Sequence, residues 1–363
     1  MKETKRRFVG IDLGKREYTM AIIGKNGKMN IHQGKTSIQG RTALYKKLEA
    51  EDKVALEAGN LAFIMAREIM EQIGSEVRVL NSAKLPFIWD APTKTDKEDA
   101  MKLAHLVEER RDEKLPIVPL PSEKELERRK ILASYGREMR NRTRHLNTLH
   151  AVFVHQGHTT IVKKNLITAK RREEAIQLLI GLEREEAEWL LKYLEIHELR
   201  IKELKRKIEE EAKTDKDMKN LQTIPGVGPV VAYAFTAHVG DGSRFSKGAQ
   251  VSNYIGFVPR LDYSGTIQRN GHITKQGNSY LRGLLVQAAW TTVRSKKGGA
   301  LRTRYTYYTL CQGASKKKTV VSIARKLTEH MYSILRSKSA YEIQRWNGPE
   351  DKKIVLSNLK NCA

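Results

Sequence analysis

The middle of this 363-residue chain, from residue 123 to about residue 213, consists almost entirely of helix-forming residues. Apolar side chains such as Leu190 and Leu194 recur there at three- and four-residue spacing, which is typical of long amphipathic helices. Prolines between residues 115 and 122 interrupt the chain just before this run. We therefore expect an antiparallel helical hairpin or coiled coil over residues 122–215, acting as a linker and dimerisation region or as an arm that grips nucleic acid.

The residues before this run alternate between strand and helix patterns. Strands are expected at residues 8–12, 18–23, 54–57 and 77–80, and helices at residues 42–48 and 61–73. A further helix is predicted to begin at Asp96, with Thr95 as its cap. Strands that alternate with helices after an opening meander indicate an α/β domain of the ribonuclease-H type, which we assign to residues 1–114.

Glycine and other small residues become frequent after residue 216, and acidic residues become rare. We assign a third, mostly helical domain to residues 216–345 and a basic tail to residues 346–363. The sequence from Ile224 to Pro229 is typical of a helix-hairpin-helix. The free amides around Gly226 and Gly228 would accept a phosphate without reading base sequence.

The charge of the chain predicts a polyanionic partner. Its net charge is +25, and residues 291–363 contribute 16 basic against 4 acidic side chains. The candidate phosphate-binding side chains are Arg137, Arg140 and Arg144 on one helix face, Arg260, Lys275 and Arg282 in the glycine-rich region, and Lys316, Lys317, Lys318, Arg325 and Lys326 near the end.

Other classes of protein are excluded by composition. No apolar run reaches the length of a transmembrane helix, and Asp12, Lys15 and Arg16 break the first apolar stretch too early for a secretory signal. Cys311 and Cys362 are the only cysteines, which excludes a disulfide framework and a zinc cluster and fits a reducing cytosol.

Four acidic residues are candidates for a metal site. Asp12 and Glu57 end two predicted strands, while Asp96 and Asp99 share one face of a predicted helix. Together they could hold Mg²⁺, or Mn²⁺, against phosphate oxygens. The plainer alternative is that the four acids have no shared role. Asp12 would then be a turn residue and Glu57 a surface carboxylate, and the helix dipole would favour Asp96 and Asp99 at a helix N-terminus.

Ser264 stands beside Gly265, between two basic, glycine-rich stretches. Spacing alone favours a turn residue here over a nucleophile.

These motifs occur in an order that resembles the DEDD transposases of bacterial insertion sequences. That group also contains Piv-type DNA invertases, and its insertion-sequence members use a bridge RNA. The resemblance covers nearly the whole chain and rests on Gly10-Ile11-Asp12, Glu57-Ala58-Gly59, Thr93 to Ala100, Ile224 to Gly228, Gly256 to Arg260, Ser264-Gly265, Thr274 to Asn278 and Ile323 to Leu327.

The resemblance implies a RuvC-like catalytic domain whose Asp12, Glu57, Asp96 and Asp99 bind Mg²⁺. It also implies a C-terminal transposase domain in which Ser264 attacks the scissile phosphate. The family usually shows two serines before the glycine, whereas Tyr263 precedes Ser264 here. The resemblance further implies that the partners are double-stranded DNA and a guide RNA and that the chain forms a homo-dimer or tetramer. The expected location is the cytoplasm of a bacterium or archaeon, in association with the nucleoid.

Other functions remain open from the sequence. Gly10 to Gly14 also resembles the first phosphate loop of actin-like ATPases, although no second loop follows. A non-catalytic nucleic-acid-binding protein would explain the charge equally well. A Holliday-junction resolvase would share the acids but would need neither a serine nor a third domain. A Piv-like site-specific DNA invertase is a further alternative.

Overall fold

A computed structural model describes residues 6–59, 61–81, 84, 95–264 and 267–342. The chain forms two compact units, residues 1–120 and residues 121–363. The predicted tail 346–363 lies outside the described residues. In the described part of the chain no helix is both long and apolar enough to cross a membrane.

The first unit is a mixed α/β unit built on a sheet of order β3-β2-β1-β4-β5. Its strands are β1 Phe8–Leu13, β2 Glu17–Ile23, β3 Met29–Lys35, β4 Lys53–Glu57 and β5 Glu76–Leu80. Strands β1, β2 and β3 form an antiparallel meander, while β4 and β5 run parallel to β1. The prediction of an opening meander followed by an α/β arrangement is therefore confirmed.

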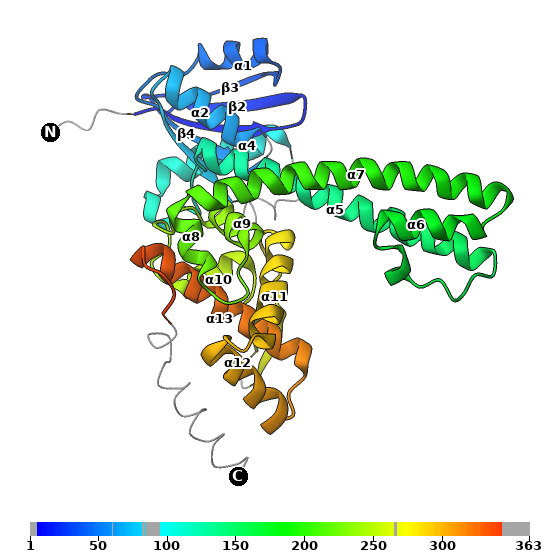
Figure 1. The fold of residues 1–363 in the computed structure, drawn as a ribbon. Coiled ribbons are helices and arrows are strands. Elements are labelled where there is room, and N and C mark those ends of the chain that lie inside the picture. The colour runs from blue at the N-terminus through cyan, green and yellow to red at the C-terminus, as the bar shows by residue number, and fades with distance from the viewer. Residues whose placement is uncertain (1–5, 60, 82–83, 85–94, 265–266, 343–363) are drawn as a thin grey trace. The chain divides into compact units, whose positions relative to one another are not determined.

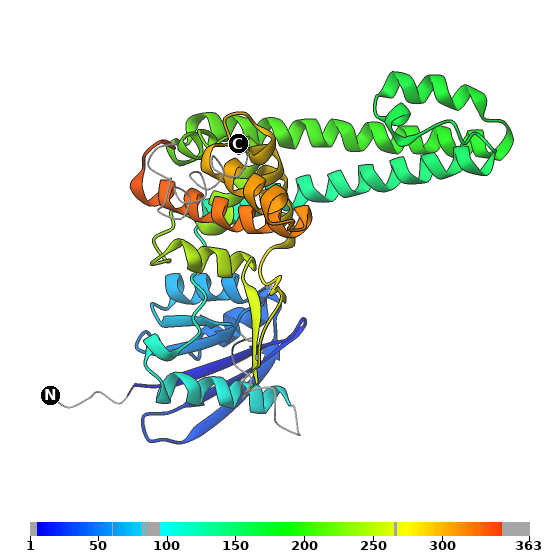
Figure 2. The same cartoon turned by 90° about the horizontal axis from the view of Figure 1, so that it is seen from below.

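Helices cover both faces of this sheet, as Figure 2 shows. On one face, α1 (Ile38–Tyr45) and α2 (Ala62–Gln72) cover a core of strand side chains such as Val9, Ile11 and Val54. On the other face, α4 (Asp96–Glu109) packs on β1, β2 and β4. The Thr95 side chain caps α4 as predicted, by accepting from the Glu98 amide. The helix predicted at residues 42–48 is instead α1, because Ser37 supplies an earlier cap.

The second unit contains a long pair of helices, α5 (Glu123–His155) and α7 (Gly181–Thr214), which lie side by side in Figure 1. Ion pairs join Arg128 to Glu211 and Arg142 to Glu198, so residue numbers rise along one helix as they fall along the other. The pair is therefore antiparallel, in agreement with the predicted hairpin. The helix α6 (Ala169–Ala175) and two 3-10 turns, Lys163–Leu166 and Ile176–Leu178, connect its far end.

The remaining elements pack around the near end of this hairpin. They are α8 Lys216–Gln222, α9 Pro229–Val239, α10 Gly248–Ile255, β6 Pro259–Ser264, β7 Ile267–Ile273, α11 Ser279–Arg294, α12 Gly299–Thr306, a π-helical turn Tyr307–Cys311 and α13 Lys316–Ser337. The two-stranded sheet of β6 and β7 lies within the domain that is predicted to be mostly helical, and the sequence patterns predict no strand there.

The second unit has no packing boundary at the predicted division between residues 215 and 216. Leu132 of α5 and Leu204 and Ile208 of α7 belong to the same hydrophobic core as the later helices. The inner half of the hairpin is part of that core because its apolar stripe is covered by α8 and α9.

Candidate functional site

Four acidic side chains come from three elements at one edge of the sheet. Asp12 lies near the end of β1 and Glu57 ends β4, and these two strands are parallel neighbours. Asp96 and Asp99 lie in the first turn of α4. Because side chains alternate along a strand, Asp12 lies on the same face of β1 as Gly10 and thus faces α4.

Gly10 allows α4 to lie directly on β1. A Cβ on Gly10 would lie 2.1 Å from the carbonyl oxygen of Ala100 and 2.4 Å from the amide nitrogen of Ala104. Any other residue would push the helix away. This close approach holds the first turn of α4, with Asp99, near the end of β1.

The electrostatics of Asp12 report the convergence of the four acids. Burial raises the pKa of Asp12 to about 6, and the charges of Asp96, Asp99 and Glu57 add to that rise. A backbone hydrogen bond from Leu13 opposes it. Perturbed carboxylates of this kind concentrate at functional sites.

Asp99 is the buried member of the cluster. It is 4% exposed, its Oδ1 has no hydrogen-bond partner, and its nearest cation is Lys102, with Nζ 3.9 Å from Oδ1. A buried carboxylate oxygen left in this state costs about 1–3 kcal/mol, which a bound cation would offset. No three Asp, Glu, His or Cys side chains of the described residues are close enough to hold a metal ion as they stand. The fit to a divalent cation is thus one of residue type and charge, without a closed ligand set.

Ser264 is the last residue of β6 and pairs with Ile267 of β7. Its backbone therefore lies at the tip of a β-hairpin. Its side chain and Gly265 lie outside the described residues.

The loop between β7 and α11 packs closely against the end of α10. A Cβ on Gly256 would lie 2.3 Å from the Gln276 carbonyl oxygen, and one on Gly277 would lie 2.2 Å from that of Tyr254. Between them Lys275 adopts a left-handed backbone conformation (φ 54°), which is uncommon outside glycine. Lys275 is exposed, so this rigid loop presents its ammonium group to solvent.

Arg282 of α11 helps to hold the same loop. Its Nη1 donates to the carbonyl oxygens of Ile255 at 3.0 Å and Gln276 at 2.7 Å. The predicted phosphate clamp at Arg282 is therefore at least partly engaged in supporting the loop that carries Lys275.

The predicted arginine face of α5 is accessible. Arg137, Arg140 and Arg144 are all exposed, and their spacing places them on one side of the helix. Arg137 has a weak ion pair with Glu138 at 3.7 Å.

Lys316, Lys317 and Lys318 form the exposed first turn of α13, which contains no acidic residue. Cations at a helix N-terminus oppose its dipole, so this turn gains from a bound anion. Arg325 and Lys326, farther along α13, both pair with Glu329, at 3.6 and 3.1 Å. Arg260 is exposed in β6.

The glycine turn between α8 and α9 has two distinct halves. A Cβ on Gly226 would lie 2.5 Å from the Thr292 hydroxyl, and that hydroxyl donates to the Pro225 carbonyl oxygen at 2.7 Å. Gly226 therefore allows close packing on α11. Gly228, which precedes α9, faces open space and keeps the helix start accessible.

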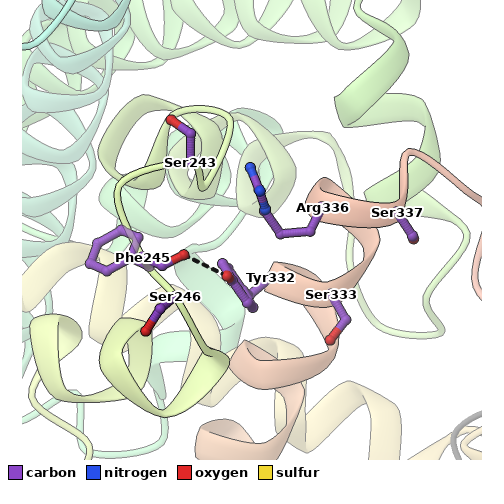
Figure 3. Close-up of a pocket in the computed structure, with 7 residues that line it drawn as sticks. All are labelled: Ser243, Phe245, Ser246, Tyr332, Ser333, Arg336 and Ser337. Atoms are coloured by element: carbon purple, nitrogen blue, oxygen red, sulfur yellow. Dashed lines mark hydrogen bonds between the residues drawn. The ribbon is translucent and has the colours of Figure 1, made fainter.

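Sequence reasoning missed a cavity of about 650 Å³ between the α9–α10 loop and the end of α13. Figure 3 shows the Arg336 side chain extending toward the loop that carries Ser243, and Tyr332 donating to the Phe245 carbonyl oxygen at 2.6 Å. Arg336 and the serines at positions 333 and 337 share this end of α13. Their close spacing on one helix was the only available signal.

Comparison with known proteins places these features in a family context. Residues 218–306 match the model of the family described as "Transposase IS116/IS110/IS902 family". A "Probable family 20 transposase" of Pseudomonas aeruginosa is 28% identical over 79% of this chain and 85% of its own length. The "Putative transposase y4qE" of Sinorhizobium fredii is 26% identical over 91% of this chain and 88% of its own. The "Pilin gene-inverting protein" of Moraxella bovis is 30% identical over 37% of this chain and 38% of its own.

Proposed function

The chain belongs to the IS116/IS110/IS902 family of transposases, and from that premise we propose that it cleaves and rejoins DNA at the ends of an insertion sequence. The observation that carries this proposal is the placement of Asp96, Asp99 and Glu57 near Asp12, whose pKa is raised by burial and, to a smaller extent, by the charges of these three acids. The mixed sheet with α4 on the face of Asp12 supports a ribonuclease-H-like, RuvC-like catalytic unit.

The four carboxylates would hold Mg²⁺ or Mn²⁺. Such an ion, when bound, neutralises charge on a phosphate and favours attack on it. Asp99, whose buried Oδ1 has no hydrogen-bond partner, would be one of the residues that hold the ion, together with Asp12 and Glu57 at the strand ends. The close contact at Gly10 keeps the α4 ligands in register with those of β1.

Ser264 would act as the nucleophile. Its Oγ forms a bond to the scissile phosphorus as the P–O bond to the sugar breaks, and the proton lost by the hydroxyl balances the one gained by the released sugar oxygen. The phosphoserine link conserves the energy of the broken bond for rejoining. Its backbone position at the end of β6, where the β6–β7 hairpin turns, is compatible with this role.

Double-stranded DNA and a guide RNA are the proposed partners. The exposed arginine face of α5, Lys275 on its rigid loop, and the lysine turn at the start of α13 supply phosphate contacts without base readout.

The outer face of α7 supports an oligomer. Leu182, Trp189, Tyr193 and Ile196 are 75, 55, 46 and 63% exposed, although large apolar side chains at helical spacing normally face a partner. Tyr193 also stacks on His145 of α5, at the border between this row and the side of α7 that α5 covers. The exposed part of the row fits a second copy of the chain.

A site-specific DNA inversion is the second candidate. It rests on the similarity to the pilin gene-inverting protein of Moraxella bovis. Inversion and transposition would use the same acids and serine and would differ in how the DNA ends are paired.

Substitution of Asp12 tests the proposal. The Asp12→Asn protein should lose strand exchange by orders of magnitude with Mg²⁺ or Mn²⁺ present, since it removes one ligand of the cluster. Its DNA affinity should stay at the wild-type level, which is measured in parallel without metal. Full recombination by Asp12→Asn would refute the assignment of the acids.

A further inference from the structure

A second cavity lies in the first unit, at the sheet edge where β1 and β4 end. It has a volume of about 590 Å³, and its lining includes Lys15, Arg16, Lys35, Thr36, Ser37 and Leu61. These residues come from the β1–β2 turn, the junction of β3 with α1, and the segment between β4 and α2. We propose that Lys15, Arg16 and Lys35 bind backbone phosphates of a nucleic-acid strand that continues from the carboxylate cluster, an inference that rests on the proposed function.

The walls of this cavity are fixed by backbone contacts. Thr36 donates to the β1–β2 turn twice, from its amide to the Arg16 carbonyl oxygen at 2.9 Å and from its hydroxyl to the Lys15 carbonyl oxygen at 3.1 Å. Gly40 brings the start of α1 onto β3, because a Cβ there would lie 1.9 Å from the Lys35 carbonyl oxygen. The three basic side chains therefore emerge from a rigid frame, which lowers the entropy cost of binding.

These cations are not engaged in ion pairs with the described carboxylates. Lys15, Arg16 and Lys35 are all exposed and have no ion pair within 4.0 Å among the described residues. The acid in the lining, Glu17, lies opposite Lys35 in the strand register.

Several other basic side chains of the same unit are held by acids, whereas a few, such as Lys28, have no ion pair with a described carboxylate. Arg7 pairs with Asp52 at 2.7 Å and Arg41 with Glu68 at 3.0 Å. Lys15, Arg16 and Lys35 differ in that three such cations line one cavity, and this concentration of positive charge favours an external anion.

The position of the cavity identifies that anion. Asp12 precedes Lys15 by three residues, and Glu57 precedes Leu61 by four, so the cavity adjoins both strand-end carboxylates along the chain. Four acids repel a polyanion, and a strand placed at them needs cations beside them. The guanidinium and ammonium groups of the cavity can donate hydrogen bonds to phosphodiester oxygens, and so can the hydroxyl of Ser37.

Charge removal in the full-length chain tests the site. The variant K15Q/R16Q/K35Q is compared with K28Q, a lysine exposed in the turn at the opposite end of the same sheet. Binding of a labelled oligonucleotide is measured against salt concentration in a chelator, so that neither metal nor catalysis contributes. The oligonucleotide is supplied as single-stranded DNA, as duplex DNA and as RNA of the same sequence.

The triple variant should lower the slope of log K against log salt by about 0.7 to 0.9 for each phosphate that the protein no longer neutralises, while K28Q leaves the slope unchanged. The nucleic acid that shows the larger change is the one bound there. An unchanged slope for all three probes, or an equal decrease in K28Q, would overturn the inference. The inference would also be overturned if the triple variant lost binding to polyglutamate but kept wild-type binding to nucleic acid, because the cavity would then recognise an acidic peptide.

Failure of the site and failure of the proposed function give different results. If the slope falls but wild-type protein with Mg²⁺ cleaves no DNA, the phosphate site stands and the catalytic proposal fails. If wild-type protein cleaves and the slope does not change, the site alone is wrong. Both variants should unfold at the wild-type melting temperature, because all four substituted side chains are exposed. That result would exclude misfolding as the cause of a changed slope.

Discussion

Replacing Gly10 with alanine should damage the first unit at the close contact between β1 and α4. The new methyl group would lie 2.1 Å from the Ala100 carbonyl oxygen, whereas ordinary contacts begin near 3.4 Å. The opposing atoms belong to the backbone of α4, so rotation of a side chain cannot relieve the overlap. The helix must move away from β1 by about 1 Å or more, and Asp99 moves with it.

The energetic cost follows from this geometry. Overpacking a close contact costs about 1–3 kcal/mol, and a contact with backbone on both sides belongs at the upper end. For a unit of this size each 1 kcal/mol lowers the melting temperature by roughly 4 °C. We therefore expect Gly10→Ala to melt several degrees below wild type and to lose strand exchange even where it is fully folded.

Hydrogen exchange measured peptide by peptide reports on α4 separately from the second unit. Protection should fall in residues 96–109 and stay unchanged in α9 and α11. Gly59→Ala is the stability control, because its Cβ would meet nothing closer than the Glu57 carbonyl oxygen at 3.9 Å. A Gly10→Ala protein that melts with wild type and keeps α4 protected would show that the helix does not rest on β1 at this position.

Three further predictions concern the second unit. Ser264→Ala should bind DNA normally yet form no covalent protein–DNA adduct; peptide mass spectrometry of the wild-type adduct should place it on Ser264, and attachment at Tyr263 would refute the serine mechanism. Neutralising Lys316, Lys317 and Lys318 together should lower the salt slope of DNA binding by about 0.7 to 0.9 for each phosphate released from this turn, and an unchanged slope would remove the turn from the interface. Burial lowers the pKa of His238 to about 4, so its neutral form stabilises the fold above about pH 6.5. This contribution, at most about 3 kcal/mol, should disappear as the pH falls toward 4, and His238→Gln should flatten the pH dependence of thermal unfolding.

Short-range sequence patterns predict those features of the fold that depend on residues close together in the chain. Thr95 caps α4 and Ser122 forms a capping box with Glu125 at the start of α5, because both depend on residues three apart. The β6–β7 hairpin had no such signal. Its strands carry polar residues and glycine, and only their pairing with each other defines them.

Long-range packing accounts for the rest of the difference. Spacing alone predicts that α5 and α7 have apolar stripes, but it does not say that Leu132 and Leu204 join the core of α9 and α13 while the far ends form a core of their own. The close approach at Gly10 is similarly invisible, since it depends on which helix crosses that glycine.

The charges illustrate the same limit for function. A count of basic residues treats all of them as available, yet Arg128 and Arg172 are buried in ion pairs with acids of α7 and Arg282 supports a loop. The charge that can reach a nucleic acid is what remains after these internal contacts are made. In the first unit that remainder includes Lys15, Arg16 and Lys35, which form no recognisable motif because nothing in their spacing differs from that of paired residues. A phosphate site on this chain is therefore better predicted from where folding leaves basic residues without acidic partners, near the proposed catalytic acids, than from where basic residues are frequent.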